Sequence, residues 1–447
     1  MTASIVWFRR DLRLGDNPAW ARGTQSDRVI PLFVIDPGLF RAVSSRRRSL
    51  LVGGLQALDQ SLGTLGGRLR VEIGDPSSVV PTVAGESGAD VVYVNREVTP
   101  YGVARDERVA RLVNVERSEG LYVHPPGSVL TAGGRPYRVF TPFYRAWSKR
   151  TPDVLSDPGS ASISDSTGAG IPSIPGDYPA GEQKALGRLD RFATRVDRYY
   201  HERDRPDLDV TSHLSIDLKY GWLGARTVFE TITSGTEGAS ALIRQLAWRD
   251  FFGHVLAEAP EIVHEPMRPE YRTINWHDDE AGFAAWQSGM TGYPIIDAGM
   301  RQLVTEGWIH NRVRLLAASF LVKDLLVDWR KGERFFRRQL LDADVAQNVG
   351  NWQWVAGTGS DAAPYFRIFN PVTQSRRFDP DGGYIRRWVP EIAALPNELM
   401  HAPWETEPRQ LAAFGVELGV TYPQPIVEHS MARERALAAY EAARSRD

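Results

Sequence analysis

The sequence of 447 residues contains no cysteine. This absence excludes disulfides, zinc–thiolate sites, iron–sulfur clusters and thiol nucleophiles. There is also no apolar run of about 18 residues, which excludes a membrane-spanning helix, and the first residues show no cleavable signal pattern. We therefore expect a cytoplasmic protein without a membrane partner.

Several catalytic signatures are missing as well. No G-x-G-x-x-G follows the first apolar run, so a dinucleotide site of the Rossmann type is unsupported. H-E-x-x-H, the P-loop and G-x-S-x-G are also absent, so nothing in the sequence favours a hydrolase or a kinase. We predict no metal site.

Lysine is scarce, with five among the 53 basic residues, and the net charge of −2 gives no overall field that would attract nucleic acid. Residues 301–390 nevertheless hold 14 Lys and Arg against 9 Asp and Glu. Tryptophan is plentiful, and seven of the 13 lie between Trp248 and Trp354. This density is typical either of a helical core or of surfaces that stack on aromatic ligands and carry electrons.

The first part of the chain alternates short apolar runs with amphipathic stretches. The pattern predicts strands and two helices, with strands at 4–8, 29–35, 68–73, 90–94 and 121–123 and helices at 49–65 and 103–115. Strand–helix alternation indicates a parallel sheet covered on both faces, so we predict a doubly wound α/β domain at 1–130.

The rest of the chain has a different pattern. Residues 150–180 are rich in Ser, Gly, Pro and Asp and cannot bury a core, so we place a linker at 131–184, long enough to drape over a neighbouring domain. Beyond it the hydrophobic period is helical, and an all-helical domain is predicted at 185–447. Its clearest helices are expected at 239–257, 295–305, 309–327, 333–341 and 431–444.

Polar side chains within the helical half are candidate binding residues. Gln245 and Trp248 stand three apart and share a helix face. The segment 211–215 precedes a helix, where its hydroxyls and amides either cradle an anion or cap the helix. Arg314 lies in an apolar helix and needs a carboxylate, for which Asp342 and Asp344 are the candidates.

The segment 348–354 combines the most polar and aromatic groups. Trp352 and Trp354 cannot face the same side of a helix, so one can serve a buried ligand and the other a groove. Arg367 follows among aromatic residues, a mixture suited to stacking and to phosphate contact. A tryptophan-rich core helix with a capped end is the alternative.

Long stretches of the chain resemble the photolyase/cryptochrome family, most closely the class I cyclobutane pyrimidine dimer photolyases. The most specific are TGYPIIDAGMRQL, HNRVRLLAASFLVKDLLVDWR and NWQWVAGTGSDAAPYFRIFNP, and matching segments spread over nearly the whole chain. The resemblance implies an α/β antenna domain, a helical domain that binds FAD, and UV-damaged DNA as partner. It implies a carbon–carbon lyase in which excited, reduced FAD gives an electron to a flipped-out dimer.

The resemblance also assigns roles to individual residues. It implies that FAD is bound by Tyr199, Thr211, Ser212, Leu214, Ser215, Arg314, Asp342, Asp344 and Asn348, with Asn348 facing flavin N5. It implies an electron relay from the surface to oxidised flavin through Trp276, Trp329 and Trp352. It implies that the damaged DNA is contacted by Gln245, Trp248, Asn311, Arg312, Leu315, Trp354 and Arg367.

Two positions depart from the class I pattern. Gln245 stands where that class usually has a glutamate that hydrogen-bonds the dimer. Tyr101 and Gly102 stand where folate-binding members have Asn-Glu, which favours 8-hydroxy-5-deazaflavin over methenyltetrahydrofolate as the antenna chromophore. An empty antenna pocket is a further alternative.

Two alternative functions remain open. A cryptochrome-like blue-light photoreceptor would bind FAD without repairing DNA, and Gln245 is its best support. Repair of (6-4) photoproducts is less well supported, because that group relies on histidines near the lesion and His310 precedes Asn311 rather than replacing it. We expect the protein to be a monomer.

Overall fold

The computed structural model describes residues 2–176, 178–232, 235–361, 363–364 and 366–445. The chain forms two compact units, the first made of Met1–Tyr200 and Ser212–Pro260 and the second of His201–Thr211 and Glu261–Asp447. These units are defined by contacts within the structure, whereas the predicted domain boundaries were drawn from amino-acid composition. The predicted boundaries therefore stay a prediction. Within the described ranges, every helix is too short or too polar to cross a membrane.

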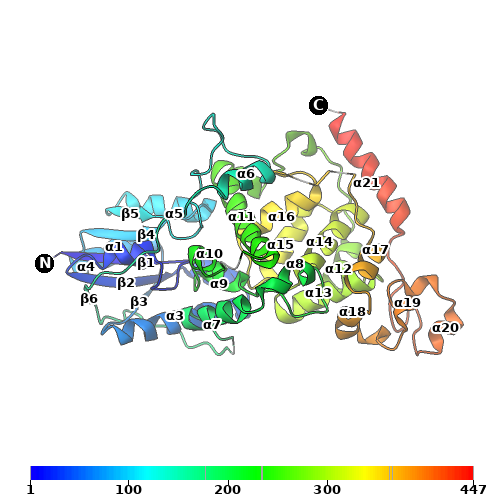
Figure 1. The fold of residues 1–447 in the computed structure, drawn as a ribbon, viewed down its shortest axis with the longest axis horizontal. Helices are drawn as coiled ribbons and strands as arrows, with labels where there is room; N and C mark the ends of the chain where they lie inside the picture. Colours follow the sequence, from blue (N-terminus) through cyan, green and yellow to red (C-terminus); the bar gives the residue numbers. More distant parts are fainter. Residues whose placement is uncertain (1, 177, 233–234, 362, 365, 446–447) are drawn as a thin grey trace. The chain divides into compact units, whose positions relative to one another are not determined.

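A parallel sheet organises the first unit (Figure 1, blue to cyan). Its strands lie in the order β3-β2-β1-β4-β5, with a short β6 also paired to β2. Their bounds are Ala3–Phe8 for β1, Arg28–Ile35 for β2, Arg70–Ile73 for β3, Val91–Asn95 for β4, Val115–Ser118 for β5 and Ser162–Ile163 for β6. The predicted α/β class with a doubly wound parallel sheet is confirmed.

Both faces of the sheet are covered, as the alternation of side chains along β1 demonstrates. Ile5 and Trp7 point to one face, where they pack in a cluster with Val83 of α4 and Val109 of α5. Phe8 points to the other face, and its ring centroid lies 6.0 Å from that of Trp20 in α1. Because both faces are buried, the central strands β1 and β2 read as continuous apolar runs rather than as an alternating pattern.

Two expectations in the first unit were wrong. The apolar run 121–123 is not a strand, and the fifth strand is β5, which begins where the helix predicted at 103–115 was expected to end. β5 is a polar strand that pairs only with β4 among the described strands, so it carries no apolar signal. The run 121–123 is instead buried against helix α11, whose Asp250 carboxylate accepts hydrogen bonds from the amides of Val123 and His124.

The linker predicted at 131–184 is mostly irregular, but it also contains helix α6, Phe140–Trp147, whose Phe140, Phe143 and Trp147 are buried in the core. The later part of this segment runs along the sheet. β6 lies within it and extends the edge of β2, with Arg28 opposite Ser162. Further along, Gly168 forms an isolated bridge with Val71 of β3. The polar composition therefore predicted a segment without a core of its own, while the open edge of the sheet supplies its hydrogen bonds.

Many helices begin at a polar cap followed by proline. Asn17, Asp36, Asp75, Thr99 and Asn370 each accept a hydrogen bond from the first turn, and proline follows each of them. The helices of the first unit, with α8 at its boundary, are α1 Pro18–Gly23, α2 Pro37–Ala42, α3 Ser45–Thr64, α4 Pro76–Ser87, α5 Pro100–Ala110, α6 Phe140–Trp147, α7 Glu182–Ala193, α8 Tyr199–Glu202, α9 Ser215–Tyr220, α10 Ala225–Thr231 and α11 Glu237–Glu258.

In the described part of the second unit, all the regular secondary structure is helical. Its helices are α12 Glu280–Ser288, α13 Pro294–Glu306, α14 Asn311–Ser319, α15 Trp329–Gln339, α16 Val345–Ala356, α17 Pro371–Phe378, α18 Gly383–Trp388, α19 Asn397–Met400, α20 Pro408–Ala412 and α21 His429–Arg444. The single helix predicted at 309–327 is shorter than expected, because α14 continues as a π-helical turn over Phe320–Asp324. That turn carries the buried Lys323 to the carbonyl of Ala356, at 3.1 Å.

A buried carboxylate joins three segments of the first unit. Asp250 of α11 accepts hydrogen bonds from the amides of Val123 and His124 and from the indole Nε1 of Trp147, the last at 2.9 Å. Burial raises the pKa of Asp250 to about 6. One turn further along α11, His254 is 7% exposed, and burial lowers its pKa from 6.5 to about 4.

The two shifts act on stability with opposite signs. An acid whose pKa is raised on folding stabilises the fold as pH falls, whereas a histidine whose pKa is lowered destabilises it. His254 stays neutral in the folded chain but binds a proton in the unfolded chain below pH 6.5. It should therefore remove stability as pH falls from 6.5 towards 4, by up to about 3 kcal/mol.

We predict that His254→Gln will show a smaller loss of stability than the wild type between pH 6.5 and pH 4. The measurement is the urea midpoint of both proteins at several pH values in this range. Asp250 contributes equally to both proteins, so the difference between the two profiles isolates the histidine. If the urea midpoints of both proteins changed with pH in parallel, the pKa of His254 would not be lowered in the folded protein.

Candidate functional site

A cavity in the second unit gathers many of the predicted residues. It lies among α14, α15, α16 and the loop before α16, with apolar walls from Leu315, Phe336 and Val355. The predicted residues in its lining are Asn311, Arg314, Leu315, Asp342, Asp344, Asn348 and Trp352. An apolar recess with a few convergent polar groups is the usual form of a cofactor site.

An ion pair stands at one side of this cavity. The Arg314 Nη2 atom lies 2.8 Å from Asp342 Oδ2, so Asp342 is the carboxylate that the arginine needs. The Asp342 side chain is 2% exposed and that of Arg314 is 25% exposed. Arg314 Nε also donates to the carbonyl of Ile309, at 2.8 Å, which fixes the guanidinium from a second direction.

The second oxygen of Asp342 indicates what the cavity can bind. Oδ1 is buried and has no hydrogen-bond partner among the described residues. A buried acceptor of this kind is costly unless a donor reaches it. An imide N–H such as that of a flavin ring would satisfy it, so the residues present fit the predicted FAD.

The amide of Asn348 is held in one orientation. Its Nδ2 atom donates to the backbone carbonyl of Glu333, at 3.0 Å, and to Glu333 Oε1, at 2.8 Å. Both N–H bonds are thus used within the protein, which leaves the amide oxygen for a ligand. Glu333 was not predicted, because its role depends on the packing of α15 against α16 and no motif links it to Asn348.

Spacing along α16 divides its aromatic residues between two environments. Asn348 and Trp352 are four residues apart, share a face and both line the cavity. Trp352 is 2% exposed, whereas Trp354 is partly exposed and does not line this cavity. Asp344 caps this helix by accepting a hydrogen bond from the amide of Gln347, at 3.1 Å.

The three tryptophans of the predicted relay differ in burial. Trp352 lines the cavity, Trp329 is fully buried at 0% exposure, and Trp276 is partly exposed. Trp276 packs edge-on against Tyr440 of α21, with ring centroids 6.1 Å apart. Trp276 is thus the most exposed of the three, as the surface end of a relay requires, and the electron path itself stays a prediction.

One tryptophan near the cavity was not selected from the sequence. Trp286 of α12 is fully buried, and its ring centroid is 6.2 Å from that of Trp352. Its indole N–H donates to the carbonyl of Ala317, at 2.9 Å. Sequence spacing gives no sign of this contact, because α12 and α16 are distant along the chain.

A second cavity, of about 390 Å³, gathers basic residues of the second unit. Arg312 and Arg367, both predicted to contact DNA, line it together with Arg377. The guanidinium of Arg312 is paired with Asp204, at 2.9 Å, and lies over the ring of Phe378. Arg367 is exposed, which suits a phosphate contact; Tyr365 in the same motif lies outside the described residues.

Other predicted residues belong to the first unit. Trp248 of α11 is partly exposed and stacks on Phe140 of α6, with ring centroids 3.6 Å apart and an interplanar angle of 7°. Gln245 makes one long hydrogen bond, of 3.5 Å, to the carbonyl of Ala241, so its amide is available to a ligand. The first unit also contains three residues of the predicted phosphate-binding segment, Ser212, Leu214 and Ser215.

The remaining two predicted FAD residues are Thr211, which begins that segment, and Tyr199, which precedes it by twelve residues. Tyr199 begins α8, and its ring packs edge-on against Phe192 with centroids 5.6 Å apart. Thr211 is partly exposed and is assigned to the second unit. The common role of these residues at the FAD phosphates stays a prediction.

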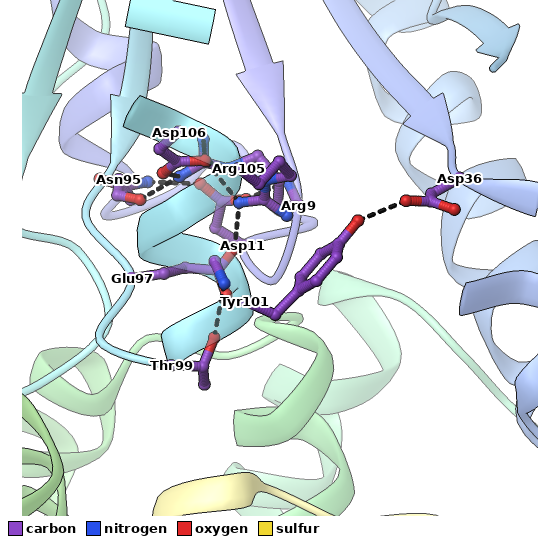
Figure 2. Close-up of polar contacts among 10 residues, drawn as sticks. Arg9, Asp11, Asp36, Asn95, Glu97, Thr99, Tyr101, Arg105 and Asp106 are labelled. Atoms are coloured by element: carbon purple, nitrogen blue, oxygen red, sulfur yellow. Dashed lines mark hydrogen bonds and ion pairs between the residues drawn. The ribbon is translucent and has the colours of Figure 1, made fainter. Parts of the chain in front are cut away.

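The sheet of the first unit has its own polar site. The strand order reverses between β1 and β4, and ligands of such sheets bind at the carboxyl ends of the strands there. Figure 2 shows that charged residues meet at this edge, where Arg9 pairs with Asp106 and Arg105 pairs with Glu97. Burial would raise the pKa of Glu97, but the nearby arginines outweigh burial and lower it to about 2.

Tyr101 and Gly102 lie beside this charged group. Tyr101 reaches from α5 to Asp36 at the end of β2, and its hydroxyl donates to that carboxylate (Figure 2). Burial raises the pKa of Tyr101 to about 12, and Asp36 adds to the shift. A Cβ atom on Gly102 would lie 2.8 Å from Thr99 Oγ1 and 2.9 Å from Glu97 Oε2, so a larger residue requires these groups to move.

Comparison with known proteins agrees with this geometry. Residues 242–442 match the FAD binding domain of DNA photolyase, and residues 4–159 match the DNA photolyase family. A deoxyribodipyrimidine photo-lyase of Agrobacterium fabrum is 41% identical over 98% of this chain and 97% of its own. The structure of a class III photolyase from Agrobacterium tumefaciens is 39% identical, covers 100% of this chain and 98% of that one, and superposes with a TM-score of 0.93.

A cryptochrome from Synechocystis is also similar, at 29% identity and a TM-score of 0.91, over 98% of this chain and 99% of that one. The likeness to a class III photolyase means that the predicted resemblance to class I is not exclusive. Both family matches and the near-complete coverage support one conclusion: the chain belongs to the photolyase/cryptochrome family and carries that family's FAD-binding domain.

Proposed function

We propose that this protein is a photolyase that repairs cyclobutane pyrimidine dimers in UV-damaged DNA. The cavity of the second unit carries the proposal, because it joins a buried ion pair, a fixed amide and a buried tryptophan in a member of this family. When bound, reduced FAD would supply on excitation by light the electron that opens the cyclobutane ring, and this electron would return to the flavin after the ring has split. The residues of the chain bind, orient and insulate, which explains why no acid–base pair is needed.

Each polar group of the cavity has a separate task in this proposal. Asp342 Oδ1 would accept a hydrogen bond from the flavin imide, while Arg314 holds the other oxygen of the same side chain. The amide oxygen of Asn348 would accept from N5–H, which would favour the reduced flavin because oxidised N5 carries no hydrogen. Asp344 lines the same cavity and would lie near the polar edge of the ring. The FAD phosphates are assigned to Tyr199, Thr211, Ser212, Leu214 and Ser215.

Trp352, Trp329 and Trp276 carry an electron from the surface to oxidised flavin in this proposal. The decrease in burial from Trp329 to Trp276 supports the direction. Damaged DNA is held by two kinds of contact. Arg312 and Arg367 bind phosphates, supported by their common cavity, and the flipped dimer is contacted by Gln245, Trp248, Asn311, Leu315 and Trp354.

The crevice of the α/β sheet is the proposed antenna site. Tyr101 and Gly102 at this site support 8-hydroxy-5-deazaflavin over methenyltetrahydrofolate, because folate-binding members have Asn-Glu at these two positions. We further propose a cytoplasmic monomer whose partner is UV-damaged DNA and which does not bind membranes.

A cryptochrome-like photoreceptor is the second candidate function. Two observations favour it, namely Gln245 at the predicted dimer contact and the likeness to the Synechocystis cryptochrome. The two functions share FAD and light, so FAD binding alone does not separate them. Light-dependent repair of an oligonucleotide with one thymine dimer does separate them, because only the photolyase restores the two thymines.

Arg314→Ala should lower the FAD content of the purified protein. The change removes the partner of a carboxylate that is 2% exposed, and breaking a buried pair costs about 3–5 kcal/mol. The measurement is flavin absorbance per chain together with the thermal midpoint. Arg338→Ala, at an exposed position of α15, is the control and should match the wild type. A stable Arg314→Ala protein with full FAD content would contradict the assignment.

Trp276→Phe should slow light-driven reduction of oxidised FAD without unfolding the protein. Phenylalanine keeps a ring against Tyr440 but is much harder to oxidise, so it cannot pass the electron on. Photoreduction is followed by flavin absorbance under blue light, and Trp404→Phe serves as the control. Repair by chemically reduced enzyme should be preserved. Unchanged photoreduction in Trp276→Phe would remove this residue from the path.

Gln245→Glu should introduce a pH dependence into repair that the wild type lacks at this position. An amide donates a hydrogen bond at any ordinary pH, whereas a carboxylic acid donates only while protonated. Repair by the variant should therefore rise as pH falls through the pKa of the new acid. Gln245→Leu leaves the dimer carbonyl unpaired, which should cost about 1–3 kcal/mol of binding.

The measurement is the yield of light-dependent thymine-dimer repair by the wild type and both variants, at several values between about pH 5 and pH 8. Repair by the wild type with little pH dependence supports the proposal. If the wild type repairs nothing and Gln245→Glu gains repair, the photoreceptor function replaces it.

A further inference from the structure

The guanidinium of Arg244 in α11 lies over two aromatic rings of α6. Its Cζ atom is 5.0 Å from the ring centroid of Phe140 and 4.9 Å from that of Tyr144. The side chain is partly exposed. Throughout the described ranges, no carboxylate pairs with Arg244 and no acceptor takes a hydrogen bond from it.

The neighbouring Arg249 behaves differently. Its Nη1 atom donates to the carbonyl of Leu121, and its guanidinium lies over the ring of Tyr122. Arg249 therefore has a structural acceptor, while Arg244 on the same helix has none. A guanidinium carries five N–H donors in one plane, and stacking its face on rings leaves those donors at the edge, open to a ligand.

The rings under Arg244 continue to Trp248. Phe140 is 1% exposed and stacks on Trp248 with centroids 3.6 Å apart and planes at 7°. Phe140 also stacks on Tyr144, at 5.8 Å and 17°. Arg244 and Trp248 are one helical turn apart and touch the same ring, so Phe140 sets the position of both side chains.

We propose that Arg244 binds a backbone phosphate of the damaged DNA strand. Phe140 is a positioning residue that sets the separation between this phosphate and the base stacked on Trp248. The two non-bridging oxygens of a phosphodiester can accept two hydrogen bonds from one guanidinium edge. This inference rests on the proposed function, because the ligand is the DNA that a photolyase repairs.

The experiment measures binding of wild type, Arg244→Gln and Arg244→Lys to matched oligonucleotides with and without one thymine dimer, over about 50–200 mM salt. Losing one phosphate contact should weaken binding by Arg244→Gln roughly ten-fold for both DNAs. It should also reduce the slope of log affinity against log salt by about 0.7–0.9. Arg244→Lys keeps the charge and should restore the slope but only part of the affinity.

Arg111→Gln is the matched control, because Arg111 is exposed at the end of α5 and has no ion pair among the described residues. It should reproduce the wild-type slope. Phe140→Leu should keep the slope of the wild type and lose discrimination between damaged and undamaged DNA. Flavin absorbance per chain checks that each variant is folded.

The outcomes separate this inference from the function on which it rests. Equal slopes for Arg244→Gln and wild type would overturn the phosphate contact, even if the wild type repairs dimers. A wild type without preference for damaged DNA would overturn the proposed function, while a reduced slope in Arg244→Gln would still support the phosphate contact. Unaltered discrimination in Phe140→Leu would overturn the positioning role.

Discussion

The buried carboxylate of Asp342 imposes the constraint on which the cavity depends. A carboxyl group that is 2% exposed needs a polar partner, and Arg314 meets this need only if α14 and the loop before α16 keep a separation of 2.8 Å between the two side chains. The bond from Arg314 to the carbonyl of Ile309 fixes the same spacing from the other side. The pair therefore fixes the spacing of these elements at one side of the cavity.

A second buried carboxylate, that of Asp250, shows how a structural acid differs from one that can bind a ligand. Asp250 receives hydrogen bonds from three donors of its own unit, so both of its oxygens have partners. Asp342 has a partner for one oxygen, while the other has no hydrogen-bond partner among the described residues. Asp250 therefore joins segments of the fold, and Asp342 has an acceptor left for a ligand. This difference, rather than burial as such, distinguishes a structural acid from a binding acid.

The aromatic residues serve packing and function together. Trp329 and Trp286 are fully buried, and Gly332 approaches the ring of Trp352 so closely that a Cβ atom there would lie 2.2 Å from it. A tryptophan-rich core and an electron path were alternatives for the sequence; the burial of these rings shows the core packing, and the electron path stays a prediction. Trp248 is similar, since its contact with Phe140 contributes to the core and leaves part of its ring exposed.

Much of this protein could be predicted from local pattern. Apolar runs and helical periods are properties of neighbouring residues, so they predicted the parallel sheet, the long helices and, through the family motifs, the residues that line the cavity. Local pattern failed where a distant partner decides the structure. The apolar run 121–123 packs against α11 and donates a backbone hydrogen bond to Asp250 instead of forming a strand. The sequence of β5 is too polar to be recognised as a strand.

The partners of individual side chains depended entirely on tertiary structure. Spacing showed that Gln245 and Trp248 share a face, but only packing brings Phe140 over Trp248 and under Arg244. Packing likewise selects Asp342 over Asp344 as the partner of Arg314 and turns the Asn348 amide towards Glu333. A sequence determines which groups a helix face presents. The distance and direction of a contact between remote segments are decided only when the segments pack, because side-chain interactions act over a few ångströms.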